Sequence, residues 1–199
     1  RLPVSFPVLY LRLPARTEVW ETNGKVAWVA ADLPLAEQVP IDFDAVRDGR
    51  RLFEWQPSAP ATLAWVEAKD GGDPKKPAAV RDELYVAAAP FRGTPQRLVG
   101  LENRFSSSYW TPSGPVIVSE YWRKTRRLRT WTVAVESGQE PIKLFDRSSE
   151  DRYSSPGSPV TVPNPAGRPV TLTAPDGAVY FSGLGASAEG DRPFVDRVA

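Results

Sequence analysis

An all-β fold is predicted by three features of this sequence. The 199 residues include 21 prolines and 14 glycines, spread at short intervals that leave little room for long helices. Between these breaks stand short runs rich in Val, Tyr, Trp and Thr, residues that strands favour. No apolar pattern with a helical period extends beyond about two turns. We therefore expect many short strands, and one short helix over Phe43–Leu52.

The expected strands follow one another along the whole chain. In order they are Val4–Arg12, Val26–Ala31, Arg51–Trp55, Thr62–Ala68, Glu83–Ala89, Arg97–Val99, Phe105–Trp110, Val116–Trp122, Leu128–Val135, Ile142–Phe145, Val170–Thr173, Ala178–Ser182 and Phe194–Val198. Turn-forming residues or charged loops separate most of them, as expected of strands joined by turns.

A repeat of about 50 residues underlies these strands. Trp55 is matched by Trp110, and residues 64–67 are matched by residues 117–120. Both tryptophans are expected in a strand-packed core. Four strands per repeat are typical of a β-propeller blade, which buries its faces against neighbouring blades. The sequence therefore predicts a partial β-propeller of about three to four four-stranded antiparallel blades.

The repeat also divides the chain. The expected parts are residues 1–45 for the end of a first blade with a Pro-rich connector, 46–100 for one blade, 101–147 for a second, and 148–199 for the start of a further blade.

Composition excludes several kinds of chemistry. The chain has no Cys and no His, so it cannot by itself form a disulfide, a Ser-His-Asp triad or a His-based zinc site. Its net charge is +1, without the basic excess of typical nucleic-acid-binding proteins. No apolar run approaches the about 20 residues of a membrane span. We expect no metal, cofactor, nucleic-acid partner or membrane partner. Because Met is also absent, we expect a fragment or a processed product.

The most basic stretch is YWRKTRRLRTW, where the repeat places the turn between the second and third strands of a blade. One interpretation is a positively charged surface that steers an acidic substrate. Its residues would be Arg123, Lys124, Arg126 and Arg127. The interpretation that we favour is a solvated hairpin turn whose arginines pair with the nearby acids of the segment DRSSED.

A second charged stretch is the loop KDGGDPKK, which holds Asp70 and Asp73. Carboxylates in a short loop can bind Ca²⁺, but two of them without a longer ligand sequence are few for that ion. We favour a turn with Asx-type hydrogen bonds.

The third charged stretch is DRSSEDRYSSPGSP, residues 146–159. Glu150 and Asp151 could form a carboxylate pair for acid–base chemistry. Adjacent side chains of a strand point to opposite faces, however, so they would not converge there. We favour a loop that joins two blades and is held by ion pairs. The pairing residues would be Asp146, Arg147, Glu150 and Arg152.

Long segments of the chain are similar to one family of enzymes. They are PIDFDAVRDGRR (40–51), TLAWVEAKDGGDP (62–74), SEYWRKTRRLRTW (119–131), LFDRSSEDRYSSPGSPV (144–160) and AEGDRPFVDR (188–197). In them the chain resembles the N-terminal β-propeller of glutamyl endopeptidases, in the prolyl oligopeptidase family of serine peptidases. The resemblance covers residues 40–199, and residues 1–39 match more loosely.

The resemblance implies a protein of two domains. A propeller would restrict access to a C-terminal α/β-hydrolase domain that holds the catalytic triad and cleaves after Glu. This chain contains no G-x-S-x-G motif, since GLGASAE differs from it, so no catalytic residue is assigned. The segment DRSSEDRYSSPGSP, which closely matches the family, would face the hydrolase domain. Its interdomain residues would be Asp146, Arg147, Glu150 and Asp151.

The function expected from these observations is that of a non-catalytic part of a peptidase. Its partners would be its own C-terminal hydrolase domain and peptide substrates. The alternative is a stand-alone propeller-type binding or scaffold module. Abundant Arg, Ala and Pro beside sparse Lys are typical of high-GC bacterial genes. We therefore expect a soluble protein of the bacterial cytoplasm or periplasm.

Overall fold

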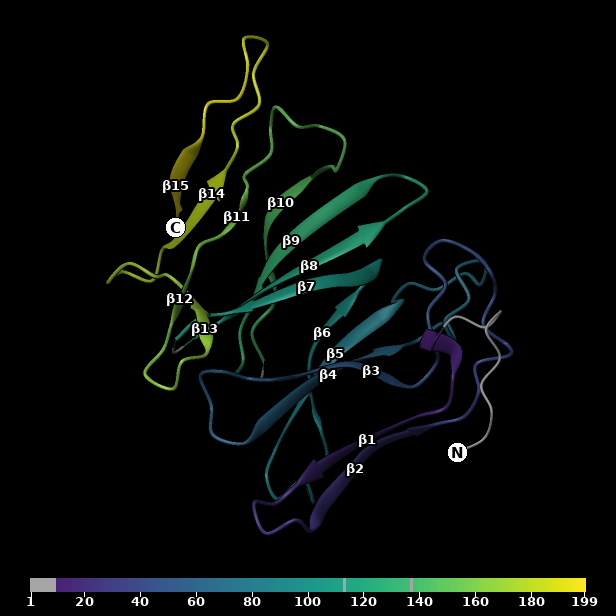
Figure 1. Cartoon of the computed structure of the whole chain (residues 1–199). Coiled ribbons are helices and arrows are strands. Elements are labelled where there is room, and N and C mark those ends of the chain that lie inside the picture. Colours follow the sequence, from purple (N-terminus) through teal and green to yellow (C-terminus); the bar gives the residue numbers. More distant parts are fainter. Residues whose placement is uncertain (1–9, 113, 137) are drawn as a thin grey trace. The chain divides into compact units, whose positions relative to one another are not determined.

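The computed structural model describes residues 10–112, 114–136 and 138–199, and it confirms the all-β prediction (Figure 1). Strands are the predominant regular structure of the described ranges. In the described ranges the helical structure consists of the 3-10 helix η1 (Tyr10–Arg12). The strands form antiparallel sheets of two to four strands.

The chain divides into two compact units, and the first comprises residues up to Glu54 together with Thr62–Glu102. It contains a hairpin and a four-stranded sheet in which consecutive strands are neighbours. The hairpin strands are β1 (Ala15–Trp20) and β2 (Val26–Leu33), and the sheet strands are β3 (Arg50–Trp55), β4 (Thr62–Ala68), β5 (Asp82–Ala88) and β6 (Gln96–Leu101).

The second unit comprises residues 55–61 and Asn103–Ala199. Its four-stranded sheet has the same neighbour order as that of the first unit. The strands of this sheet are β7 (Arg104–Trp110), β8 (Val116–Trp122), β9 (Arg127–Val133) and β10 (Ile142–Ser148). A three-stranded sheet consists of β11 (Ser158–Pro159), β14 (Val179–Gly183) and β15 (Phe194–Val198), and a hairpin consists of β12 (Thr161–Pro163) and β13 (Pro169–Thr171).

Most of the predicted strands are present. The strands β4, β8 and β15 have the predicted bounds, and most of the others shift by one to three residues at an end. The strands β1, β11 and β12 were not predicted, because each is short or polar. The predicted strand Val4–Arg12 lies mostly outside the described residues, and its last three residues form η1.

The helix predicted over Phe43–Leu52 is wrong. This stretch forms turns and then enters β3. Asp44 and Gly49 have positive φ angles of 61° and 87°. A residue in this left-handed region does not fit a right-handed helix. The segment therefore cannot form the helix that its apolar spacing suggested.

The core of the first unit is built on β4. Its sequence TLAWVEA is almost continuously buried, whereas the side chains of β5 alternate between buried and half-buried. Leu63 forms a buried cluster with Val19 and Ala30. Trp65 is fully buried, and the guanidinium of Arg50 lies 4.9 Å from the centre of its ring. The apolar run and a cation–π contact therefore fix this strand at the centre of the unit.

The core of the second unit is built on β8 in the same way, where Val116, Ile117 and Val118 are buried. Trp110 is 4% exposed, as predicted for a core residue. Its repeat partner Trp55 is 41% exposed, so the prediction of a core position is wrong for that residue. Leu52 has a positive φ of 55° within β3, an irregularity that the repeat alone does not reveal.

Within the residues described, no helix has the length and apolarity needed to cross a membrane.

Candidate functional site

The basic stretch forms the predicted hairpin turn. β8 ends at Trp122, β9 begins at Arg127, and these two residues are paired across the hairpin. Arg123 and Lys124 are exposed in the turn between them. The location of the charge run between the second and third strands of a sheet is confirmed.

Two arginines of this stretch pair with acids of the segment DRSSED, as the favoured interpretation predicted. Arg127 donates from Nε and Nη2 to the two carboxylate oxygens of Asp146, at 2.7 and 2.8 Å. Arg126 Nε lies 3.2 Å from Glu150 Oε1. The charges of these two arginines are therefore matched within the protein. The steering role of Arg123, Lys124, Arg126 and Arg127 stays a prediction.

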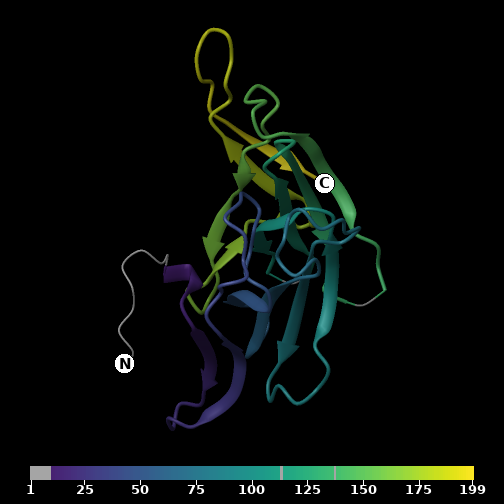
Figure 2. The same cartoon turned by 90° about the vertical axis from the view of Figure 1, so that its right-hand side faces the viewer.

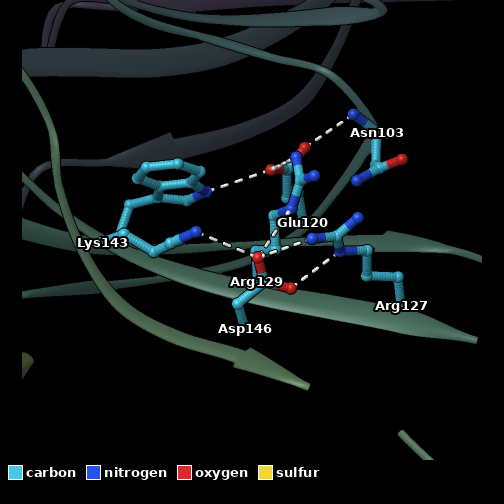
Figure 3. Close-up of polar contacts among 7 residues, drawn as sticks. Asn103, Glu120, Arg127, Arg129, Lys143 and Asp146 are labelled. Atoms are coloured by element: carbon cyan, nitrogen blue, oxygen red, sulfur yellow. Dashed lines mark hydrogen bonds and ion pairs between the residues drawn. The ribbon is translucent and has the colours of Figure 1, made fainter. Parts of the chain in front are cut away.

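Asp146 is surrounded by cations (Figure 3). Lys143 Nζ lies 3.1 Å and Arg129 Nε 3.4 Å from its Oδ2, in addition to the fork from Arg127. The hydrogen bonds from Arg127 are the main reason that the pKa of Asp146 lies well below its usual range, and Lys143 adds to them. Partial burial opposes the shift but does not cancel it. Asp146 therefore remains a carboxylate far into the acid range.

A second carboxylate lies deeper in the same network. The Glu120 side chain is 1% exposed and accepts a hydrogen bond of 2.6 Å from the backbone N–H of Asn103. It also accepts one of 3.1 Å from Trp131 Nε1 and one of 3.4 Å from Arg129 Nη1 (Figure 3). Buried charge is tolerated only where such partners compensate it. Glu120 thus ties β8 to β9 and to the residue that precedes β7.

The first unit contains a similar arrangement at the position that the repeat relates to Glu120. Glu67, on the second strand of its sheet, accepts a 2.9 Å hydrogen bond from Trp65 Nε1 and one of 3.2 Å from Arg50 Nε. In both sheets a glutamate on the second strand therefore joins an indole and a guanidinium. The partners come from β3 and β4 in the first sheet and from β9 in the second, so the two networks share residue types but not strand positions.

The predicted connecting loop begins later than expected. Asp146 and Arg147 belong to β10, because the ladder with β9 continues as far as Ser148. Glu150 pairs with Arg126, whereas Asp151 accepts hydrogen bonds from the backbone N–H and the hydroxyl of Ser154. The two adjacent carboxylates thus bind different partners, as expected of side chains that do not converge.

Arg147 differs from the predicted ion-pairing residue. Its guanidinium donates to the backbone oxygens of Ser148 and Asp151, at 3.0 and 2.8 Å, and to Ser155 Oγ at 3.2 Å. It therefore holds the loop through its backbone and not through a carboxylate. Whether Asp146, Arg147, Glu150 and Asp151 face another domain stays a prediction.

The acidic loop of the first unit forms Asx-type turns, as predicted. Asp70 accepts a 3.0 Å hydrogen bond from the backbone N–H of Gly72, and Asp73 accepts one of the same length from Lys75. The other oxygen of Asp70 lies 2.8 Å from Arg81 Nη1. In the described part of the chain no group of three or more acidic side chains could hold a metal ion.

Sequence reasoning missed several members of the Asp146 network, among them Glu120 and Lys143. A signal for Glu120 was present, because the repeat aligns it with Glu67, two acids at one position of an otherwise apolar strand. Lys143 carried no such signal. Its role depends on a β10 register that places it beside Asp146.

The ion pairs of Asp146 predict an acid-sensitive stability. Because the pKa of this carboxyl is lower in the folded than in the unfolded state, its contribution is complete above about pH 4 and is lost as the pH falls. We expect Asp146→Asn to lower the free energy of unfolding by about 1–2 kcal/mol at neutral pH. Urea titrations of both proteins from neutral pH downward measure the difference. The two stabilities should converge at low pH, and a difference that does not change with pH would contradict this assignment.

These features define an all-β protein whose two four-stranded antiparallel sheets each contain a hydrogen-bonded charge network centred on a glutamate. Over 98% of its length the chain is 40% identical to a protein of rice (Oryza sativa subsp. japonica) named probable glutamyl endopeptidase, chloroplastic. It is 41% identical, over the same share, to a protein of Arabidopsis thaliana with the same name. The resemblance to glutamyl endopeptidases is thereby confirmed.

The chain spans 21% of the length of each of these relatives. No family model matches the chain, and no solved structure matches it at a significant level. The predicted location in the bacterial cytoplasm or periplasm is contradicted, because both relatives are chloroplastic plant proteins. The high content of Arg, Ala and Pro is thus a poor guide to location here.

Proposed function

We propose that this chain is the non-catalytic propeller part of a serine peptidase that cleaves peptide bonds after Glu. The observation that carries the proposal is the 40% identity over 98% of the chain to a protein named glutamyl endopeptidase. In this proposal the chain controls the access of peptides to a C-terminal α/β-hydrolase domain. The absence of His supports a division of labour, since the chain alone cannot form a Ser-His-Asp triad.

The blade assignment is part of the same proposal. Two sheets of four consecutive antiparallel strands, β3–β6 and β7–β10, have the neighbour order of propeller blades. Their glutamates Glu67 and Glu120 occupy the same position of the repeat, and each binds an indole and a guanidinium. In this assignment β1 and β2 are the last strands of an earlier blade. The sheet β11-β14-β15 begins a further blade.

The peptidase proposal predicts a difference between the 199-residue chain and the longer protein that contains it. With a fluorogenic peptide that carries Glu before the reporter group, the longer protein should release the reporter. The isolated chain should show no hydrolysis above background. Activity of the purified chain, with contaminating peptidases excluded, would overturn the assignment of a non-catalytic part.

Control of access has its own readout in the longer protein. The same protein substrate is offered folded and unfolded, so that its Glu content is constant. The unfolded form should be cleaved and the folded form spared, because only extended segments would pass the propeller. Equal rates on both forms would contradict the access role while leaving the peptidase assignment in place.

A further inference from the structure

A groove lies in the second unit between the loop that joins β10 to β11 and the loop that joins β14 to β15. Both loops are visible at the same end of this unit, in green and yellow (Figures 1 and 2). Residues of both line the groove, which has a volume of about 450 Å³. Sites for small ligands typically measure about 300–1,000 Å³, so the groove is large enough for one.

The walls of the groove are close-packed backbone. A Cβ atom at Gly157 would lie 1.9 Å from the backbone oxygen of Ser182, and one at Gly185 would lie 1.9 Å from that of Arg192. Both glycines also have positive φ angles, 76° and 63°. Only glycine permits this approach. The first contact holds the β10–β11 loop against β14, and the second closes the β14–β15 loop on itself.

One arginine is held in place at the groove. The three hydrogen bonds of Arg147, to Ser148, Asp151 and Ser155, fix its half-buried guanidinium. They do not use all the donors of a guanidinium. The charge of Arg147 interacts with that of Asp151, which is one cause of the lowered pKa of that carboxyl, but its hydrogen bonds go to backbone oxygens and a hydroxyl. A preoriented cation with unused donors is the kind of group that recognises a carboxylate.

The remaining charges of the lining favour an anion. Arg152 lines the groove and is exposed. Asp151 also lines it, but its carboxylate accepts both hydrogen bonds of Ser154, which lower its pKa and keep it engaged. Two guanidinium groups against one engaged carboxylate leave the lining positive. Leu184, 64% exposed, adds an apolar surface beside these charges.

A smaller cavity of about 170 Å³ adjoins the groove and shares Arg147 and Ser158 with it. Hydroxyl groups line much of this cavity, among them those of Ser107 and Ser119. Arg147 thus lies where an open, positively charged groove meets a small cavity lined by both hydroxyl-bearing and apolar side chains. This arrangement suits an extended chain along the groove with one polar side chain near Arg147.

We propose that this groove binds an extended peptide that carries a carboxylate side chain, with Arg147 and Arg152 as its anion-binding residues. Its identification with a peptide that contains Glu rests on the proposed function. The binding itself involves no hydrolysis. The groove would hold acidic segments on the propeller part before they are cleaved elsewhere.

The test uses the 199-residue chain and a fluorescently labelled short peptide with one central Glu and blocked ends. A second peptide has Gln in place of Glu. Fluorescence anisotropy should show about tenfold tighter binding of the Glu peptide, as expected for a hydrogen-bonded charge pair. Arg147→Gln and Arg152→Gln should each remove most of this preference. Added salt should weaken the binding of the Glu peptide.

The matched control is Arg168→Gln, since Arg168 is an exposed arginine of the same unit that does not line the groove. It should bind both peptides as the wild type does. Arg152→Gln keeps the test valid if loss of Arg147 loosens the loop, because Arg152 is exposed and should be replaceable without unfolding.

Equal binding of the two peptides, no binding of the Glu peptide, or wild-type binding by both variants would overturn the groove proposal. None of these results affects the peptidase proposal, which hydrolysis by the longer protein tests. Conversely, a longer protein without peptidase activity would leave a measured Glu preference of the groove intact.

Discussion

Replacement of Glu120 by Ala is expected to lower the free energy of unfolding by about 3–5 kcal/mol. The carboxylate is 1% exposed and accepts hydrogen bonds from Asn103, Trp131 and Arg129. Its removal leaves a backbone N–H and an indole N–H without this acceptor. It also removes one carboxylate contact of Arg129, whose side chain is 11% exposed. The cost of unsatisfied buried donors is added to that of a poorly compensated charge.

Urea denaturation followed by tryptophan fluorescence measures this loss, and two variants calibrate it. Glu140→Ala removes an exposed glutamate of the β9–β10 loop and should change the stability by no more than about 0.5 kcal/mol. Glu67→Ala removes the equivalent acid of the first unit, whose side chain is 27% exposed. Its loss should be intermediate, because water can replace part of its hydrogen bonding. A loss at Glu120 no larger than that at Glu140 would show that the network contributes no stability.

The strands of this protein could be predicted because their signal is local. Runs such as TLAWVEA and VIVSEYW have the composition of strands, and both form strands with the predicted bounds. The prediction of secondary structure failed where an unusual backbone dihedral angle determines the local structure. The segment Phe43–Leu52 has an apolar spacing compatible with a helix, but the positive φ of Asp44 prevents one. Nothing in the side-chain pattern announces that angle.

The charge network could be predicted only in part, because it depends on register. Glu120 lies opposite Arg129 in the β8–β9 ladder, and Arg129 lies opposite Asp146 in the β9–β10 ladder. Three charges of alternating sign therefore form a row across three strands, which is the favourable arrangement for cross-strand pairs. Sequence proximity indicated that the hairpin arginines would meet nearby acids. It did not indicate which ones, because a shift of one residue would place them on opposite faces.

The burial of the two repeat-related tryptophans could not be predicted from the sequence either. Their replacement gives the second large effect on stability that we expect. Trp110→Ala is expected to lower the free energy of unfolding by about 3–5 kcal/mol, the usual cost of deleting a large buried aromatic side chain. Trp55→Ala should cost about 1 kcal/mol, because 41% of that residue is already in water. The repeat relates the two positions and predicts equal losses, whereas the structure predicts unequal ones.

Paired urea titrations of the two variants decide between these expectations. Trp110 is 4% exposed on β7. Trp55 lies at the end of β3, beyond the positive φ of Leu52 that interrupts this strand. Phe53, two residues earlier in β3, packs against the buried cluster of the first unit. If Trp55→Ala cost as much as Trp110→Ala, Trp55 would have to be packed in solution as its repeat partner is. A clearly larger loss of stability for Trp110→Ala would show that the two tryptophans differ in burial, although the two sheets have the same strand order.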